Sequence, residues 1–344
     1  MSLIALTLII IAGILLGIFS IPVNKVKTWQ FEHIWGAGSV AALILVPWPL
    51  VLLFIPEVSD IYREISLGTL LAVVFAGFAW GIGGIFWGLG ISTLGIALGV
   101  SLMTSIINVF GSIGPLYAFE PELLLTEGGR MLIFSLIILI VGIVATAMAG
   151  HFKEKSLSPN NNDQVSDKPQ KASFLTGLTF CVLSGILSCG VNFGLVFGTP
   201  IAEKTSALGV PDYAKNFAIW SLVFTSNYLV NAFYGIYIMI KKNNVHQLWR
   251  GVNRQNWIWV LFMGLAWPGG VIIYGIGANF MGPMGAYVGF PMVMLVSILA
   301  GNVAGLLDGE WKGTDSKSKL VMILGVLIIF IAFIFLGYSN QLLS

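Results

Sequence analysis

Ten apolar runs of about 20 residues divide this chain, and each is long enough to cross a lipid bilayer as an α-helix. Only 9% of the residues are charged, whereas soluble domains carry about a quarter, so we expect an integral membrane protein. The net charge of +2 gives no reason to expect a nucleic acid partner. The runs lie near residues 3–23, 35–55, 67–90, 95–118, 130–150, 173–198, 213–240, 256–277, 281–307 and 319–338.

A glycine-rich stretch in the third run recurs in the eighth. Gly77–Gly95 and Gly264–Gly282 match without a gap at glycines, an alanine and a tryptophan. A weaker echo joins the Gly-Ile-Leu runs that begin at Gly13 and Gly185, at a somewhat smaller offset along the chain. Matched, glycine-interrupted segments in two halves of a membrane chain indicate an internally duplicated transporter. The alternative is two glycine-rich helices that resemble each other in composition alone.

A polar stretch separates the first five runs from the last five. We therefore predict an all-α membrane protein whose ten transmembrane helices form a five-plus-five inverted repeat, because an odd number of spans reverses the second copy. Residues 1–150 form the first repeat, 151–172 a polar linker and 173–344 the second repeat. The connections after odd-numbered spans hold 13 of the 17 lysines and arginines, which places them in the cytoplasm and both termini outside. Residues 3–21 are expected to be a retained span rather than a signal peptide, because no positive region precedes them.

The sequence carries no pattern typical of catalysis, of a metal site or of a bound cofactor. All 15 acidic residues and all three histidines lie in loops or at the ends of apolar runs. The two cysteines, Cys181 and Cys189, are too far apart on one helix to form a disulfide bond. We expect no enzyme, and an interior without carboxylates suits a neutral polar molecule.

Neutral polar and aromatic side chains in the apolar runs are the candidate binding groups. A sugar has an apolar face and a rim of hydroxyl groups, which an aromatic plane flanked by amides and hydroxyls can bind. Hydrogen bonds and packing between helices are the alternative explanation; they explain the serines better and the asparagines and tryptophans equally well. The predicted substrate-binding residues are Trp80, Trp87, Asn108, Ser188, Asn192, Asn231, Trp267, Tyr274 and Tyr287.

Charged side chains at the ends of the runs are the candidate gates. Opposite charges that pair at the mouth of a pore can hold it closed, although most such charges simply cap solvated helix ends. The predicted gating or coupling residues are Lys25, Glu127, Arg130, Glu203 and Glu310.

Several motifs in these segments resemble those of a known family. They are Pro22-Val-Asn-Lys-Val-Lys-Thr-Trp29, Val46-Pro-Trp48, Trp80-Gly-Ile-Gly, Thr126-Glu-Gly-Gly-Arg-Met131, Ser184-Gly-Ile-Leu-Ser188, Ala207-Leu-Gly-Val210 and Glu310-Trp311. Nearly end to end, the chain resembles the L-rhamnose–proton symporter family of the drug/metabolite transporter superfamily. The resemblance implies import of L-rhamnose or a related monosaccharide by proton symport across the bacterial inner membrane, with the sugar and the proton as partners. The lysine and arginine distribution then makes both termini periplasmic. We expect alternating access, with the two glycine-rich helices rocking against each other.

Two segments depart from the family pattern. Ile91-Ser-Thr-Leu94 stands where members carry more polar and charged groups, and Ala286-Tyr-Val-Gly289 stands where they carry a Tyr-Asp-Tyr run. Proton coupling is therefore the part of the resemblance that these residues support least. The alternatives are an exporter or uniporter of another small metabolite in the same superfamily, and a structural or sensing membrane protein without transport.

Overall fold

A computed structural model of the chain describes residues 2–19, 21, 25–27, 29–157, 174–249, 254–282, 284–307, 309 and 311–343. Within these residues the secondary structure is helical without a β-strand, and nine segments are long and apolar enough to cross a membrane. The predicted class of an all-helical membrane protein is confirmed. The elements are α1 (Leu3–Ile18), α2 (Phe31–Val40), η2 (Ala41–Leu45), α3 (Pro47–Phe54), α4 (Val58–Glu64), α5 (Leu67–Leu94), α6 (Ile96–Phe119), η3 (Pro121–Leu125), α7 (Glu127–Leu157), α8 (Phe174–Ser188), α9 (Gly190–Phe197), α10 (Thr199–Ala207), α11 (Phe217–Lys241), η4 (Val245–Leu248), α12 (Arg254–Phe280), η5 (Gly285–Gly289), α13 (Phe290–Leu307) and α14 (Ser316–Leu343).

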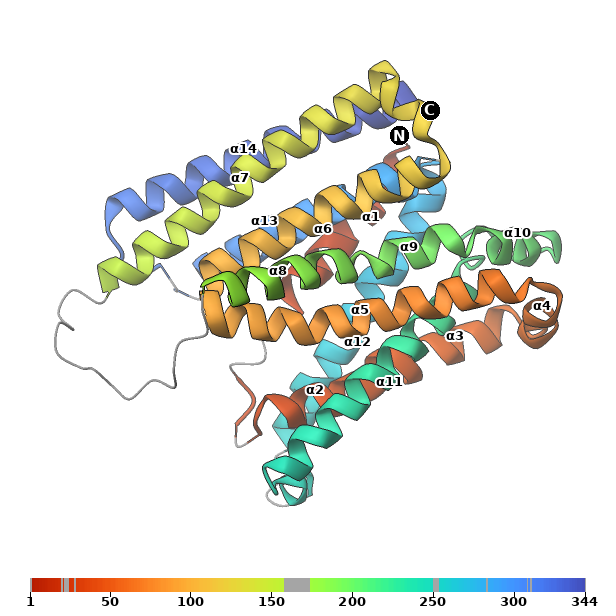
Figure 1. Cartoon of the computed structure of the whole chain (residues 1–344), viewed down its shortest axis with the longest axis horizontal. Coiled ribbons are helices and arrows are strands. Elements are labelled where there is room, and N and C mark those ends of the chain that lie inside the picture. The colour runs from red at the N-terminus through yellow and green to blue at the C-terminus, as the bar shows by residue number, and fades with distance from the viewer. Residues whose placement is uncertain are drawn as a thin grey trace.

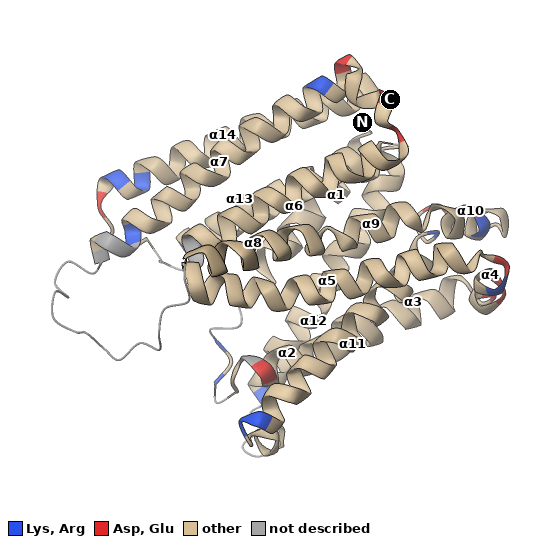
Figure 2. Ribbon diagram, in the orientation of Figure 1, with Lys and Arg blue, Asp and Glu red and all other residues tan. Residues whose placement is uncertain are grey.

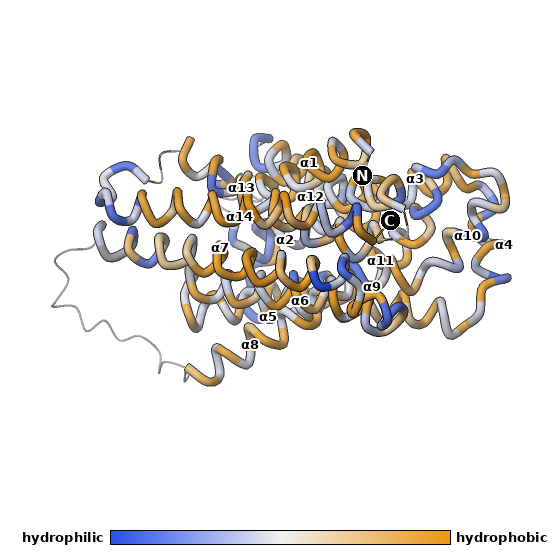
Figure 3. The backbone as a smooth tube through the Cα atoms, turned by 90° about the horizontal axis from the view of Figure 1, so that it is seen from above, coloured by the Kyte–Doolittle hydropathy of each residue, from blue (hydrophilic) through white to orange (hydrophobic). Residues whose placement is uncertain are grey.

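The long helices run between two ends of the molecule (Figure 1). We call one the linker end, where α7 stops at Leu157 and α8 begins at Phe174, and the other the termini end, near Ser2 and Leu343. Charged residues gather at these two ends, and the lengths of helix between them are almost free of charge (Figure 2). Hydrophobic residues dominate the helices in between (Figure 3). This distribution is typical of helices that cross an apolar layer and reach water at both ends.

The two glycine-rich stretches occupy α5 and α12, which run in opposite directions (Figure 1). α5 packs against α8, α9 and α11, whereas α12 packs against α1, α2 and η2. α6 contacts α8, α13 contacts α1, and α7 lies along α14. Glycines let these helices approach closely, because a glycine adds no side chain between two backbones.

The chain leaves the two glycine-rich helices through similar turns. Gly95 ends α5 with a φ of +84°, and Gly282, its counterpart in the repeat, follows α12 with a φ of +81°. Both lie in the left-handed region, which glycine adopts without steric cost.

Three predicted spans are interrupted helices. The second span consists of α2, the π-helical η2 and α3, and the ninth begins with the π-helical η5. The sixth divides at Cys189 into α8 and α9. π-Helical turns are frequent at functional sites, so η2 and η5 mark candidate positions for such a site. α7 continues to Leu157, so the predicted linker of residues 151–172 begins as helix.

Candidate functional site

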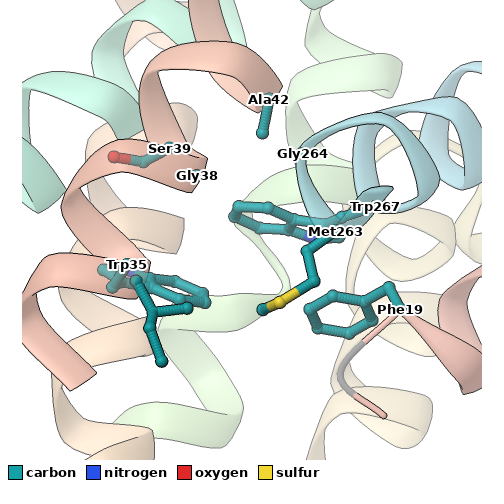
Figure 4. Close-up of a pocket in the computed structure, with 9 residues that line it drawn as sticks. Phe19, Trp35, Gly38, Ser39, Ala42, Met263, Gly264 and Trp267 are labelled. Carbon is teal, nitrogen blue, oxygen red and sulfur yellow. The ribbon is translucent and has the colours of Figure 1, made fainter. Parts of the chain in front are cut away.

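Aromatic side chains from three helices meet around a small cavity (Figure 4). Trp35 comes from α2, Trp267 from α12 and Phe19 from the end of α1. The ring centroid of Trp267 lies 5.4 Å from that of Trp35 and 6.0 Å from that of Phe19. We call this space the aromatic cavity. Its other lining residues are Ile34, Gly38, Ser39, Ala42, Met263 and Gly264.

The aromatic cavity is closed in this conformation. Its free volume is about 10 Å³, and that is about the space that one water molecule needs. Sites that hold small molecules enclose roughly 300–1,000 Å³. The surrounding helices must therefore separate before a monosaccharide can enter.

The tryptophans of the two glycine-rich stretches meet beside this cavity. Trp80 and Trp267 lie edge to face, with ring centroids 5.4 Å apart and an interplanar angle of 69°. Trp80 also contacts the ring of Phe224 at 5.8 Å. Both tryptophans are partly buried, so the structure brings this predicted pair together at the centre of an aromatic cluster.

Asn231 fixes the orientation of Trp35 in the cavity wall. Trp35 Nε1 donates a hydrogen bond of 2.7 Å to Asn231 Oδ1. Asn231 Nδ2 in turn donates to the backbone and side-chain oxygens of Asn227, one turn earlier on α11. Asn231 is buried, so its amide acts on the cavity through Trp35.

A second group of predicted residues forms a buried hydrogen-bonded cluster. Asn192 Nδ2 donates to the carbonyl oxygens of Gly111 at 2.6 Å and Ala286 at 2.9 Å. The Tyr274 hydroxyl donates to Asn192 Oδ1 at 2.5 Å. We call this the Asn192–Tyr274 cluster. Two of its members come from interrupted helices: Asn192 follows the break at Cys189, and Ala286 belongs to η5.

The aromatic cavity and the Asn192–Tyr274 cluster share one face of α12. Trp267 and Tyr274 are two helical turns apart, which is about 10 Å along the axis. On α5, Trp80 and Trp87 have the same spacing. A molecule lying between these helices would meet aromatic rings toward one side and amide, hydroxyl and carbonyl groups toward the other. That combination matches the apolar face and hydroxyl rim of a sugar.

Four other predicted residues lie nearby without joining the cluster by hydrogen bonds in the part of the chain that the structure describes. Asn108 is fully buried and donates to Thr104 O of its own helix at 2.8 Å, and its Oδ1 finds no partner among the described atoms. Ser188 ends α8, Tyr287 lies buried in η5, and Trp87 packs partly buried against the core. A buried unpaired oxygen such as Asn108 Oδ1 is able to accept a hydrogen bond from a ligand hydroxyl.

Within the described part of the chain, two ion pairs join the first half to the second. At the termini end, Lys204 of α10 pairs with Glu64 of α4, and both side chains are well exposed. At the linker end, Lys242 Nζ lies 3.1 Å from Glu32 Oε2. The Glu32 side chain is only 4% exposed, against 56% for Glu64. The two ends thus differ in whether the carboxylate is buried.

Comparison with known proteins gives the family of this chain. A sequence profile described as L-rhamnose-proton symport protein (RhaT) matches residues 3–340, which is nearly the whole chain. The chain belongs to the L-rhamnose-proton symport protein family. Similar proteins named L-rhamnose-proton symporter occur in Cronobacter sakazakii, Salmonella paratyphi B and Citrobacter koseri, at 28%, 27% and 26% identity. Each aligns over 321 residues, covering 91% of this chain and 91% of the relative. The family consists of transporters, which confirms the prediction that this chain is not an enzyme.

The predicted gating residues that the structure describes in this family member lie in different places, except that Glu127 and Arg130 line one pocket. Lys25 Nζ lies 4.9 Å from the centroid of the Trp259 ring. Glu127 and Arg130 lie exposed in the first turn of α7, where Arg130 Nε donates to Thr126 O at 3.4 Å. Glu203 is exposed on α10. Glu310 lies outside the described residues.

The sequence analysis of this L-rhamnose-proton symport family member missed Phe19, Trp35 and Glu32. Trp35 begins an apolar run and resembles the tryptophans that anchor spans at a membrane surface. Glu32 precedes the same run and resembles a solvated helix end, yet its partners Lys242 and Asn244 follow α11, in the other half of the chain. No local pattern links these residues, so only the tertiary structure could find them.

Proposed function

We propose that this chain imports a neutral monosaccharide, L-rhamnose or a related sugar, by proton symport with alternating access. The family match over residues 3–340 is the observation that carries the proposal. The relatives named L-rhamnose-proton symporter align over 91% of their own length, so the likeness extends to whole proteins. The transporter would lie in the bacterial inner membrane, with both termini in the periplasm and the lysine-rich linker end in the cytoplasm.

The proposed architecture is ten transmembrane helices in a five-plus-five inverted repeat, with α1 as the shortest crossing. Residues 1–150 would form one repeat and 173–344 the other, joined by the linker of residues 151–172. The packing supports this division, because two of the main helix contacts in one half have a counterpart in the other. α5 with α8 corresponds to α12 with α1, and α6 with α8 corresponds to α13 with α1.

Glycine contacts support the duplication at the level of single residues. A Cβ built on Gly83 of α5 would lie 2.7 Å from Ser188 Oγ of α8. A Cβ built on Gly270 of α12 would lie 2.7 Å from Leu16 Cγ of α1. The two glycines correspond in the alignment of the glycine-rich stretches. Leu16 and Ser188 correspond when the weaker Gly-Ile-Leu echo is extended by one residue.

A second pair of glycines repeats this relationship. A Cβ on Gly90 would lie 2.9 Å from Cys181 Sγ, and one on Gly277 would lie 3.2 Å from Ile9 Cδ1. Gly90 and Gly277 again correspond in the glycine-rich stretches, and Ile9 and Cys181 keep the offset of the weaker echo. If the two halves resembled each other only in composition, residues at matching positions in the two alignments would not be expected to make matching contacts.

The sugar would bind between the halves, along the facing sides of α5 and α12. Trp80, Trp87 and Trp267 would contact its apolar face, and Asn108, Ser188, Asn192, Tyr274 and Tyr287 would contact its hydroxyl groups. Asn231 would hold Trp35 in place. Access would alternate as α5 and α12 tilt against each other, and the charges at Lys25, Glu127, Arg130, Glu203 and Glu310 would gate the two mouths. The closed aromatic cavity is consistent with an occluded step of such a cycle.

Uptake of radiolabelled L-rhamnose into proteoliposomes tests this function. With the outside more acidic than the lumen, we expect accumulation above the equilibrium level, and a protonophore should abolish it. Protein-free liposomes and vesicles without a pH gradient are the controls. Uptake of none of the monosaccharides tested would overturn the sugar assignment. Rhamnose uptake that ignores the pH gradient would overturn proton coupling alone.

A uniporter or exporter of another small metabolite is the second candidate. The observation that favours it is that the described acidic residues lie in loops, in short helices or near the ends of the membrane-crossing segments. A uniporter would equilibrate its substrate across the membrane without accumulating it. The same vesicles, loaded with sugar and diluted, would show net efflux independent of the pH gradient.

A further inference from the structure

A buried carboxylate ties the start of α2 to the end of α11 at the linker end. Glu32 lies in the first turn of α2 and is 3% exposed. Its Oε2 pairs with Lys242 Nζ at 3.1 Å, and its Oε1 accepts a hydrogen bond of 2.7 Å from Asn244 Nδ2. Burying a carboxylate is unfavourable unless it is paired, so the two partners account for its ionised form at this position.

The surroundings of Glu32 also suit its protonated form. Asn244 Oδ1 is buried and has no hydrogen-bond partner among the described atoms, although it belongs to the amide that contacts the carboxylate. Rotation of this amide would present Oδ1 to a carboxylic O–H. When Glu32 takes up a proton, one O–H bond forms, the charge of the Glu32–Lys242 pair changes from zero to +1, and the ion pair is lost. Lys242 is half exposed, so water can solvate its free charge.

His33 closes the same group of residues without contributing a charge. Its ring is fully buried; Nδ1 accepts from Gln30 N at 3.2 Å, and Nε2 lies 3.0 Å from Asn244 O. A nitrogen that accepts carries no proton, so this geometry corresponds to the neutral imidazole with its proton on Nε2. The other titratable or charged groups on the elements packed against α2 are Tyr228, Tyr234, Tyr237, Lys241, His246, Arg254 and Tyr274.

Among a row of contacts along this interface, Glu32 is the member that carries a charge near pH 7. Toward the termini end, Trp35 bonds Asn231, Trp48 Nε1 donates to Thr225 Oγ1 at 2.9 Å, and Tyr62 bonds Ser221. These three contacts are between neutral groups and do not change near pH 7. Protonation of Glu32 would therefore break one contact in this row, and that contact lies next to the wall of the aromatic cavity.

Release of Glu32 would act directly on the aromatic cavity. Trp35 lies three residues after Glu32 on α2, which places both on neighbouring positions of one helix face. Trp35 and Ile34 both line the cavity. A shift in the start of α2 thus moves two of the side chains that close it.

We propose that Glu32 binds the transported proton, and that its ion pair with Lys242 keeps the linker end closed while the carboxylate is ionised. The inference rests on the proposed sugar–proton symport and names the residue that couples it. It supplies a titratable carboxylate close to the aromatic cavity, whose own lining residues are all neutral.

Replacement of Glu32 by glutamine tests the inference, because the amide mimics the protonated acid. In proteoliposomes we expect Glu32→Gln to retain rhamnose counterflow within about threefold of the unmodified protein. Accumulation driven by a pH gradient should fall at least tenfold. Asp60→Asn is the matched control, since Asp60 belongs to an exposed ion pair with Arg63, and it should leave both activities unchanged. Glu32→Gln that accumulates rhamnose like the unmodified protein would overturn the inference.

Lys242→Gln provides a second test if Glu32→Gln fails to fold or to exchange sugar. A neighbouring positive charge favours the ionised carboxylate, so its removal should shift the pH of half-maximal uptake upward by about one unit. A pH profile that coincides with that of the unmodified protein would contradict the role of the pair. Failure of the proposed function is distinguishable from failure of this inference, because in that case the unmodified protein itself would transport no rhamnose or no protons.

Discussion

Trp80 of α5 and Trp267 of α12 meet edge to face, with ring centroids 5.4 Å apart. They are the corresponding residues of the two glycine-rich stretches. Their contact joins the two halves of the chain at the aromatic cavity, where Trp267 also touches Trp35 and Phe19. A residue and its counterpart can meet in this way when the two copies face each other across an axis through the centre of the molecule.

Replacement of these tryptophans tests their role in binding. An aromatic contact contributes about 0.5–1.5 kcal/mol beyond the area that it buries. Trp80→Ala and Trp267→Ala should each raise the KM for rhamnose up to about tenfold. Trp249→Ala is the control, because Trp249 is 76% exposed. Variants that lower the melting temperature but leave KM unchanged would mean that the two rings only pack the helices.

Adjacent glycines in each half offer matched tests of close helix packing. Gly83→Ala should destabilise the protein most, by about 1–3 kcal/mol, because its new Cβ would meet the backbone nitrogen of Ser188 as well as the side chain. Gly270→Ala should cost less, because the Leu16 side chain can move and the nearest backbone atom, Ala12 O, would lie 3.1 Å away. Gly84→Ala and Gly269→Ala are the controls: neither new Cβ would have an atom within 4 Å, and alanine favours helix by up to about 1 kcal/mol. Thermal unfolding in detergent measures the stability of all four variants. Equal losses for Gly83→Ala and Gly84→Ala, or for Gly270→Ala and Gly269→Ala, would contradict the close packing at Gly83 and Gly270.

Removal of the Asn192 amide should disrupt the Asn192–Tyr274 cluster. Asn192→Ala leaves the Gly111 carbonyl without its partner and the Tyr274 hydroxyl with only its longer 3.4 Å contact to Ala286 O, and an unsatisfied buried group costs about 1–3 kcal/mol. We expect a lower melting temperature together with at least a tenfold loss of rhamnose uptake. Asn302→Ala serves as the control, because Asn302 Nδ2 bonds only the Ile298 carbonyl of its own helix among the described contacts. Normal uptake by Asn192→Ala would remove this residue from the binding site.

Ionisation of the partly buried Tyr62 hydroxyl should be detectable at alkaline pH. Its hydroxyl donates to Ala218 O and contacts Ser221 Oγ, each at 2.7 Å, and burial raises the pKa of Tyr62 from 10.0 to about 12. A pKa raised by folding means that this contribution to stability is complete below pH 10 and is lost as the pH rises from 10 to about 12. The difference in absorbance at the tyrosinate band between the unmodified protein and Tyr62→Phe should titrate near pH 12. A midpoint near pH 10 would indicate a hydroxyl open to water.

The sequence predicted those features that depend on local pattern and on the repeat. Apolar runs of bilayer length identified the helices, because each run satisfies its own backbone hydrogen bonds. The repeat singled out Trp80 and Trp267, and polar residues at helical spacing singled out Asn192, whose neighbour in space is the predicted Tyr274.

The features that could not be predicted depend on contacts between distant segments. Glu32 resembles any acid at the end of a span, and its burial follows from Lys242 and Asn244, which belong to the other half of the chain. The break at Cys189 lies inside one continuous apolar run, where hydropathy gives no warning of an interrupted helix.

Proton movement driven by rhamnose is the most direct test of the central claim. Proteoliposomes that enclose a pH-sensitive dye, with no initial pH gradient, would receive L-rhamnose from outside. The account predicts that the lumen becomes more acidic only when rhamnose and the protein are both present, and that a protonophore removes the signal. Entry of radiolabelled rhamnose into the same vesicles without any change in lumenal pH would contradict symport.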